Sequence, residues 1–209
     1  MGDYQNRITF SERESSDFTI ALLKESPFLS IEINKTLMHT QLLGRYNFTN
    51  TAAAITIGLH FDVDLKSMKK GIESYIPKNN RSQIIKQNSN TIILDAYNAN
   101  PSSVEAALKN FKTMEGDQKI VILGDMFELG KQSYAEHQSV IELAKSLDFS
   151  QLYLVGNHFF EHYQNYSNIL FFKDFERLKI HLEDYPIKQS MVLVKGSRGM
   201  ALERLLGFI

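Results

Sequence analysis

The first 43 residues carry the hydrophobic and polar pattern of β-strands. Residues 17–23 are rich in strand-forming side chains, and residues 28–33 alternate apolar with polar positions. Ser26-Pro27 separates the two runs, because proline interrupts regular hydrogen bonding. This part of the chain is therefore predicted to form short strands.

The period of the pattern then changes from that of a strand to that of a helix. Residues 47–59 are small, apolar and rich in alanine, which is typical of a buried helix. Asp64 stands where it can cap a second helix that runs to about Tyr75, with apolar side chains at helical spacing. The segment 76–80, Ile-Pro-Lys-Asn-Asn, combines proline with turn-forming asparagine. It is the best candidate for a domain boundary and predicts domains at 1–79 and 80–209.

Short apolar runs alternate with helical patterns in the second of these domains. The runs are residues 92–94, 120–123, 152–155, 169–172 and 191–194, and the helical patterns cover 102–114, 134–147 and 175–184. Such alternation predicts an α/β domain of three layers, in which helices cover both faces of a mainly parallel sheet. Ligands in such sheets bind beyond the carboxyl ends of the strands, so the residues just after each run are the candidates for a site.

The loop after residues 92–94 offers carboxylate and amide groups. Asp95 could accept hydrogen bonds from ribose hydroxyls, or could instead brace the loop or cap a helix. Asn98, Asn100 and Ser102 supply donors and acceptors suited to a peptide or a carboxylate. Pro101 is expected to begin the next helix, which is a structural role.

Two further loops add charges of both signs. Lys195, Ser197 and Arg198 combine two cations with a hydroxyl ahead of what we expect to be a last helix, which favours an anion site; a helix start with surface charges is the alternative. Asp125 and Glu128 follow residues 120–123 and could hold an ammonium group or cap a loop.

Three other polar residues lie on predicted helices. Asn47 and Asn50 share a helix face, and an amide can pair with the polar edge of adenine, although Asn47 could equally be an N-cap. His137 lies inside a predicted helix, where a lone histidine is more often packed or exposed than catalytic.

Composition narrows the classes of function. The net charge of −1 gives no broad basic field for a nucleic acid. With no cysteine, disulfides and thiolate chemistry are excluded. No apolar run approaches the roughly 20 residues of a membrane span, and the first residues lack the pattern of a signal peptide. We therefore expect a soluble, cytoplasmic protein that binds neither nucleic acid nor membrane.

Four segments together resemble the Mur ligase family. Residues 44–54 read Gly-Arg-Tyr-Asn-Phe-Thr-Asn-Thr-Ala-Ala-Ala, similar to a family stretch that has histidine where this chain has Tyr46. Asp-Ala-Tyr-Asn-Ala-Asn-Pro-Ser-Ser at 95–103, Gly-Asp-Met-Phe-Glu-Leu-Gly at 124–130 and Lys-Gly-Ser-Arg-Gly-Met at 195–200 resemble the members that add D-alanyl-D-alanine to UDP-N-acetylmuramoyl-tripeptide. Other members that add diaminopimelate or lysine are expected to carry an Asp-Asn-Pro-Arg type of loop instead.

The resemblance implies a fold and a set of roles. Residues 80–209 would be a Rossmann-like C-terminal domain, and residues 1–79 the last part of the central ATP-binding domain. Asn47 and Asn50 fall on the adenine side, Arg81 on a hinge arginine near the nucleotide, and Asp95 on a ribose contact. The substrate and phosphate side would receive Asn98, Asn100, Ser102, Asp125, Glu128, Lys195, Ser197 and Arg198. The reaction would need ATP and Mg²⁺ and pass through an acyl phosphate.

One family feature is missing from this sequence. No Gly-x-x-x-x-Gly-Lys-Ser/Thr loop is present to cradle phosphates. We therefore expect the remaining N-terminal portion of the enzyme to supply it, and the chain alone to be inactive. Two alternatives stay open: another ligase of this superfamily, such as folylpolyglutamate synthase, or a non-catalytic module that binds nucleotide.

Overall fold

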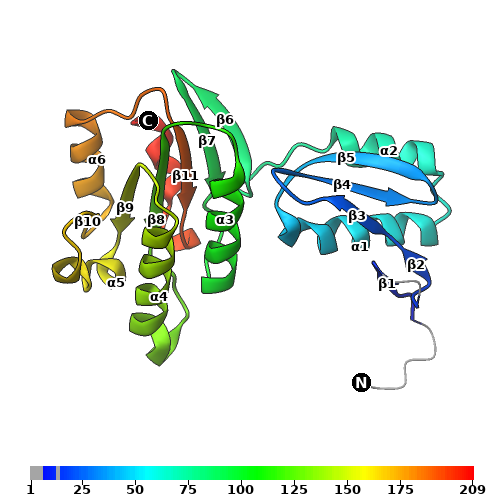
Figure 1. Cartoon of the computed structure of the whole chain (residues 1–209), viewed down its shortest axis with the longest axis horizontal. Coiled ribbons are helices and arrows are strands. Elements are labelled where there is room, and N and C mark those ends of the chain that lie inside the picture. Colours follow the sequence, from blue (N-terminus) through cyan, green and yellow to red (C-terminus); the bar gives the residue numbers. More distant parts are fainter. Residues whose placement is uncertain (1–6, 13–14) are drawn as a thin grey trace. The chain divides into compact units, whose positions relative to one another are not determined.

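The computed structural model describes residues 7–12 and 15–209, which belong to two compact units, Met1–Ile76 and Pro77–Ile209 (Figure 1). Each unit has its own layers of secondary structure. No helix among the described residues has both the length and the apolar character needed to cross a membrane.

Unit 1 packs two helices and a small antiparallel sheet around one core. The sheet runs in chain order through β3 (Ala21–Lys24), β4 (Phe28–Ile33) and β5 (Thr36–Leu43), and β1 (Phe10–Ser11) pairs with β2 (Phe18–Thr19) in parallel. Leu29, Ile31 and Ile33 alternate along β4 and are all buried in the core, as a half-buried strand requires.

The two helices of unit 1 follow the sequence pattern closely. In α1 (Phe48–His60), Phe48, Ala52 and Ile55 lie one turn apart and are buried in the same core. The helix α2 (Leu65–Ser74) begins where the carboxylate of Asp64 accepts a hydrogen bond from the backbone N–H of Ser67 at 2.9 Å. The predicted N-cap is therefore confirmed.

Unit 2 is built on a six-stranded sheet that is mainly parallel, as predicted. Its strands are β6 (Gln83–Gln87), β7 (Asn90–Asp95), β8 (Lys119–Gly124), β9 (Gln151–Val155), β10 (Leu170–Phe172) and β11 (Met191–Lys195). They lie in the order β10-β9-β8-β11-β7-β6, and every neighbouring pair is parallel except β6 with β7.

Helices cover both faces of this sheet. Helices α3 (Pro101–Thr113) and α4 (Ser133–Ser146) contact each other on one face (Figure 1). On the other face, Phe175, Leu178 and Leu182 of α6 (Phe175–Asp184) join a core with apolar side chains of β7, β8, β9 and β11. The C-terminal segment contributes Leu202, Leu205 and Ile209 to this core. The predicted three layers are thus confirmed.

The strand order brings three predicted loops to one place. The chain passes from β7 to β8 on one side, continues outward to β9 and β10, and returns through α6 to insert β11 between β8 and β7. In the register, Lys195 lies beside Asp95 on one side and Leu123 on the other. The carboxyl ends of β7, β8 and β11 therefore meet at the point where the strand order reverses, which is where ligands bind in such sheets.

Two features of unit 2 differ from the sequence expectations. The antiparallel edge strand β6 was not predicted; it joins β7 through a two-residue turn in which Asn88 has a φ of 52°. The prediction of a helix after Lys195 is wrong, because the chain there forms two 3₁₀ segments, Arg198–Met200 and Leu202–Gly207. Ala201 between them adopts the left-handed conformation with a φ of 48°, which a continuing α-helix does not allow.

Candidate functional site

A buried ion pair joins the first loop to β11. The ammonium of Lys195 lies 2.6 Å from Asp95 Oδ2 and also donates to the carbonyl of Asn98 at 3.1 Å. Ser82 donates to Asp95 Oδ1 from its backbone N–H at 2.9 Å and its hydroxyl at 3.2 Å. The Lys195 side chain is 3% exposed and that of Asp95 15%. The anion that Lys195 meets here is thus the chain's own Asp95, and this carboxylate braces the loop.

The next polar residues of this loop start α3. The side-chain oxygen of Asn100 accepts from the backbone N–H of Ser103 at 2.8 Å and from the hydroxyl of Ser102 at 3.0 Å, with Pro101 at the first helical position. Asn98 uses its side-chain oxygen on the N–H of Ala99 at 2.9 Å. Asn98, Asn100 and Ser102 are all exposed, so each remains accessible while it shapes the loop.

Asp125 and Glu128 of the second loop have different environments. The carboxylate of Asp125 is buried and accepts from the backbone N–H groups of His158 and Phe159, both at 3.0 Å, at the start of the short helix α5 (Asn157–Phe160). A Cβ on Gly156 would lie 2.3 Å from this carboxylate, so only glycine fits there. Glu128 is exposed and has a φ of 64°. Of the two acids, Glu128 is the one that faces solvent.

Ser197 connects all three loops. Its hydroxyl accepts from the backbone N–H of Phe127 at 2.8 Å and lies 3.5 Å from the carbonyl of Ala99, and its own N–H donates to the carbonyl of Asp125 at 3.1 Å. The side chain is almost fully buried. The structure therefore brings together the three segments that the sequence singled out, through hydrogen bonds between their backbones and this hydroxyl.

Arg198 and Gly196 flank that connection. The side chain of Arg198 is 60% exposed, and its Nη1 lies 2.8 Å from Glu203 Oε1. A Cβ on Gly196 would lie 2.9 Å from Leu202 Cδ1 and 3.1 Å from Gly124 Cα. Glycine at this position therefore lets the ends of β8 and β11 approach each other.

Histidine side chains lie behind the second loop. His137 on α4 is fully buried, and its ring centroid lies 5.3 Å from that of His158. Burial lowers the pKa of His137, while Asp125, 3.8 Å from its Nε2, acts in the opposite direction. Burial also lowers the pKa of His162, while Glu161 and the backbone of Tyr134 act in the opposite direction. His137 could not be chosen from the sequence alone, because the Met126 amide and the Asp125 carboxylate that face its Nε2 lie on another segment.

The remaining candidates divide between the two units. In unit 1, Asn47 occupies the N-cap position of α1, but its amide donates to the carbonyl of Leu43 at 2.8 Å and accepts from Asn50 at 3.3 Å. In unit 2, the guanidinium of Arg81 lies 3.8 Å from the centre of the Tyr97 ring, and both side chains are exposed.

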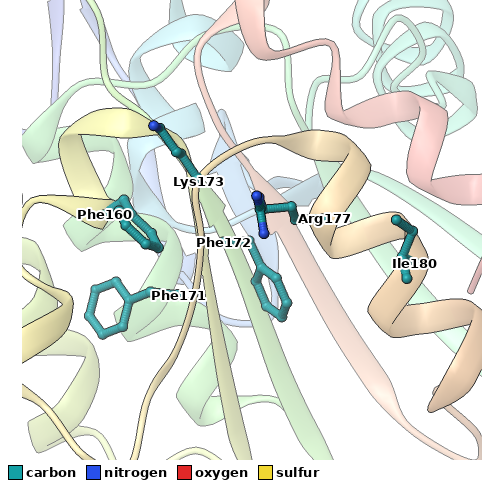
Figure 2. A pocket seen from close by; sticks show the side chains of 6 residues that line it. All are labelled: Phe160, Phe171, Phe172, Lys173, Arg177 and Ile180. Atoms are coloured by element: carbon teal, nitrogen blue, oxygen red, sulfur yellow. The ribbon is translucent and has the colours of Figure 1, made fainter.

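A surface hollow lies away from these loops. It has a volume of about 450 Å³ and is lined by Phe160, Phe171, Phe172, Lys173, Arg177 and Ile180. Figure 2 shows Phe160 and Phe171 on one side, Ile180 on the other, and Arg177 between them beside Phe172. It belongs to α5, β10 and α6, not to the ends of β7, β8 and β11. Within residues 7–12 and 15–209, no group of three or more acidic or histidine side chains could hold a metal ion.

Comparison with known proteins gives consistent matches. Residues 80–198 match the family described as "Mur ligase, glutamate ligase domain". The UDP-N-acetylmuramoyl-tripeptide--D-alanyl-D-alanine ligase of Bacillus subtilis (strain 168) is 27% identical over 213 residues, which is 98% of this chain and 44% of that protein.

Solved structures share the fold over almost the whole chain. A crystal structure of MurF from Acinetobacter baumannii has a TM-score of 0.81 at 24% identity and covers 96% of this chain and 46% of its own. The MurF ligase of Thermotoga maritima in complex with ADP has a TM-score of 0.74 at 21% identity, over 95% of this chain and 47% of its own. The chain thus spans less than half the length of these relatives.

Proposed function

This chain belongs to the Mur ligase family, and we propose that it is the C-terminal part of an ATP-dependent ligase that joins D-alanyl-D-alanine to UDP-N-acetylmuramoyl-tripeptide. Residues 80–209 would be the domain that receives the dipeptide, and residues 1–79 the end of the central domain. Such an enzyme would work in the cytoplasm on precursors of the cell wall. The B. subtilis relative, which aligns with almost the whole chain, carries the name of this activity.

The observation that carries this proposal is the junction between the second and third loops. Phe127 and Ser197 are joined by a hydrogen bond of 2.8 Å. The residues that follow them, Glu128 and Arg198, are both exposed and carry opposite charges. A dipeptide such as D-alanyl-D-alanine carries an ammonium at one end and a carboxylate at the other. Two adjacent loops that present one carboxylate and one guanidinium suit a ligand with these two charged ends.

The other candidate residues then take supporting roles. Asp125, Ser197 and Lys195 are buried and hold the loops in place, whereas Asn98 is exposed and available to a peptide group. In the proposed reaction the tripeptide carboxylate takes a phosphoryl group from ATP. The dipeptide amine then forms the amide bond as phosphate leaves and a proton is lost. Glu128 would orient that amine, and Arg198 the distant carboxylate.

The residues of this chain fit only part of a nucleotide. Asn47 and Asn50 offer amides for adenine, and Arg81 and Asp95 lie in the segments that the family resemblance assigns to the nucleotide. The sequence has no glycine-rich phosphate loop, and the described part of the chain has no cluster of acids for Mg²⁺. We propose that the rest of the longer enzyme binds the phosphates and the metal, and we assign no step on them to these residues.

Steady-state kinetics of the full-length enzyme test this assignment. Glu128→Gln and Arg198→Ala should each lower kcat/KM for D-alanyl-D-alanine. The loss should correspond to on the order of 2–4 kcal/mol of transition-state stabilisation. The control is Arg177→Ala, because Arg177 is also an exposed arginine beside an acid, Asp174, but lies in the hollow of Figure 2. If both variants stay within about threefold of the wild type, the two loops do not bind the dipeptide.

A further inference from the structure

The hydrogen bonds of His137 determine which of its ring nitrogens carries the proton. Nδ1 lies 2.7 Å from the backbone carbonyl of Ser133, and a carbonyl can only accept. Nε2 lies 3.0 Å from the backbone N–H of Met126, which can only donate. Nδ1 must therefore be protonated and Nε2 unprotonated, so the ring is neutral and held in a single tautomer.

The Met126 amide belongs to a run of three consecutive amides that are each held by a different element. Asp125 N–H donates to the carbonyl of Val155 on β9 at 3.0 Å, Met126 N–H to His137 on α4, and Phe127 N–H to the hydroxyl of Ser197. Of these three acceptors, the imidazole is the one that titrates near neutral pH. Glu128 is the next residue after Phe127. It has a positive φ and is exposed to solvent.

We propose that His137 is a positioning residue, whose neutral ring fixes the loop at residues 125–130 and so sets the place of Glu128, and that acid pH releases this loop. Its role in catalysis rests on the proposed function, in which Glu128 meets the amine of the dipeptide. A proton on Nε2 would point an N–H group at the N–H of Met126. Met126 is fully buried, so its amide would then have no acceptor.

The surroundings of the ring oppose that protonation on balance. Asp125 faces Nε2 from the loop at 3.8 Å and favours the charged form. His158 on α5 and His162 after it disfavour a positive charge on the His137 ring. Phe159 packs edge-on against the same ring, with the two ring centroids 4.6 Å apart. Burial has the largest effect and lowers the pKa of His137. The loop should therefore be held at neutral pH. The hold weakens below about pH 6.5, the ordinary pKa of histidine, and is lost as the pH falls through the lowered pKa of His137.

Nuclear magnetic resonance on the chain as it stands tests the positioning directly. At about pH 7.5, above the ordinary pKa of histidine, long-range ring correlations should show a protonated Nδ1 on His137. The exchange protection factor of the Met126 amide should fall about tenfold in His137→Gln and in His137→Leu, the equivalent of one lost hydrogen bond. In the matched control His158→Gln it should not change, because the His158 ring lies next to His137 and meets the loop at the Phe127 ring, whereas the Met126 amide donates to His137. A protonated Nε2, or unchanged protection in both His137 variants, would overturn the proposal.

Kinetics of the full-length enzyme separate this inference from the proposed function. His137→Gln should raise KM for D-alanyl-D-alanine roughly tenfold, leave KM for ATP unchanged, and shift the acid limb of kcat/KM for the dipeptide. A wild-type enzyme that does not use D-alanyl-D-alanine would refute the proposed function. The amide measurements would still test whether His137 holds the loop at residues 125–130. A wild-type enzyme that uses the dipeptide with the same KM and pH profile as His137→Gln would refute the role of His137.

Discussion

Replacing Lys195 by methionine removes one charge from the buried pair that joins β7 to β11. Methionine has nearly the length of lysine, so Lys195→Met deletes the ammonium while it keeps most of the apolar stem. Asp95 would keep its two hydrogen bonds from Ser82 but lose its cation, and the carbonyl of Asn98 would lose its donor. The variant therefore leaves a carboxylate with little access to water.

The size of the effect follows from the burial of the two partners. Breaking a buried ion pair from one side costs about 3–5 kcal/mol, because the remaining charge is not compensated. The Asp95 side chain is 15% exposed and keeps both hydrogen bonds from Ser82. The expected loss of unfolding free energy is therefore at the lower end of this range, about 3 kcal/mol. The double variant Lys195→Met/Asp95→Asn should be less destabilised, at about 1 kcal/mol, because the uncompensated charge is gone.

Native-state hydrogen exchange of the β7 and β11 amides measures this loss. These amides report on unit 2 by itself, so the result does not depend on how unit 1 unfolds. Lys188→Met is the control, because Lys188 is exposed and should change stability by under about 0.5 kcal/mol. A loss below about 1 kcal/mol in Lys195→Met, or a double variant as unstable as the single one, would refute the view that this pair is structural.

Other parts of the chain give shorter predictions. Gly196→Ala should destabilise unit 2 by about 1–3 kcal/mol in a urea melt, because its Cβ would meet Leu202 and Gly124; a change within about 0.5 kcal/mol would contradict the close packing there. Unit 2 should lose stability as the pH falls, because burial lowers the pKa of both His137 and His162. The contribution of these neutral rings is fully present above about pH 6.5 and is lost as the pH falls through the lowered folded-state pKa values, so greater stability at about pH 5.5 would refute it. The isolated chain should not release phosphate from ATP, since it lacks a phosphate loop; release that Asp95→Ala abolishes would show otherwise.

Periodicity and turn chemistry were sufficient to predict most of the elements. The predicted helix at 175–184 coincides with α6, and Asn100-Pro101 marks the start of α3, since capping and proline chemistry are local. The edge strand β6 was missed because five residues with two isoleucines give little pattern. The expected last helix failed because Ala201 takes a left-handed conformation that nothing in its neighbours indicates.

The candidate site shows a different limit. The three loops lie at one edge of the sheet because parallel strands end there, and the alternating pattern predicts parallel strands. The partners of each side chain do not: Lys195 and Asp95 lie 100 residues apart in sequence, and their pairing depends on β11 inserting beside β7. For the same reason the sequence could not separate Asp125, which holds backbone amides, from the exposed Glu128. Spacing identified the loops, and tertiary packing decides which of their side chains are accessible.

The choice of amine substrate by the full-length enzyme tests the central claim most directly. The enzyme would be given UDP-N-acetylmuramoyl-tripeptide and ATP with D-alanyl-D-alanine, or with single amino acids, and the products identified by mass. We predict one amide product with the dipeptide and none with alanine, glutamate or diaminopimelate. A product with a single amino acid and none with D-alanyl-D-alanine would contradict the account.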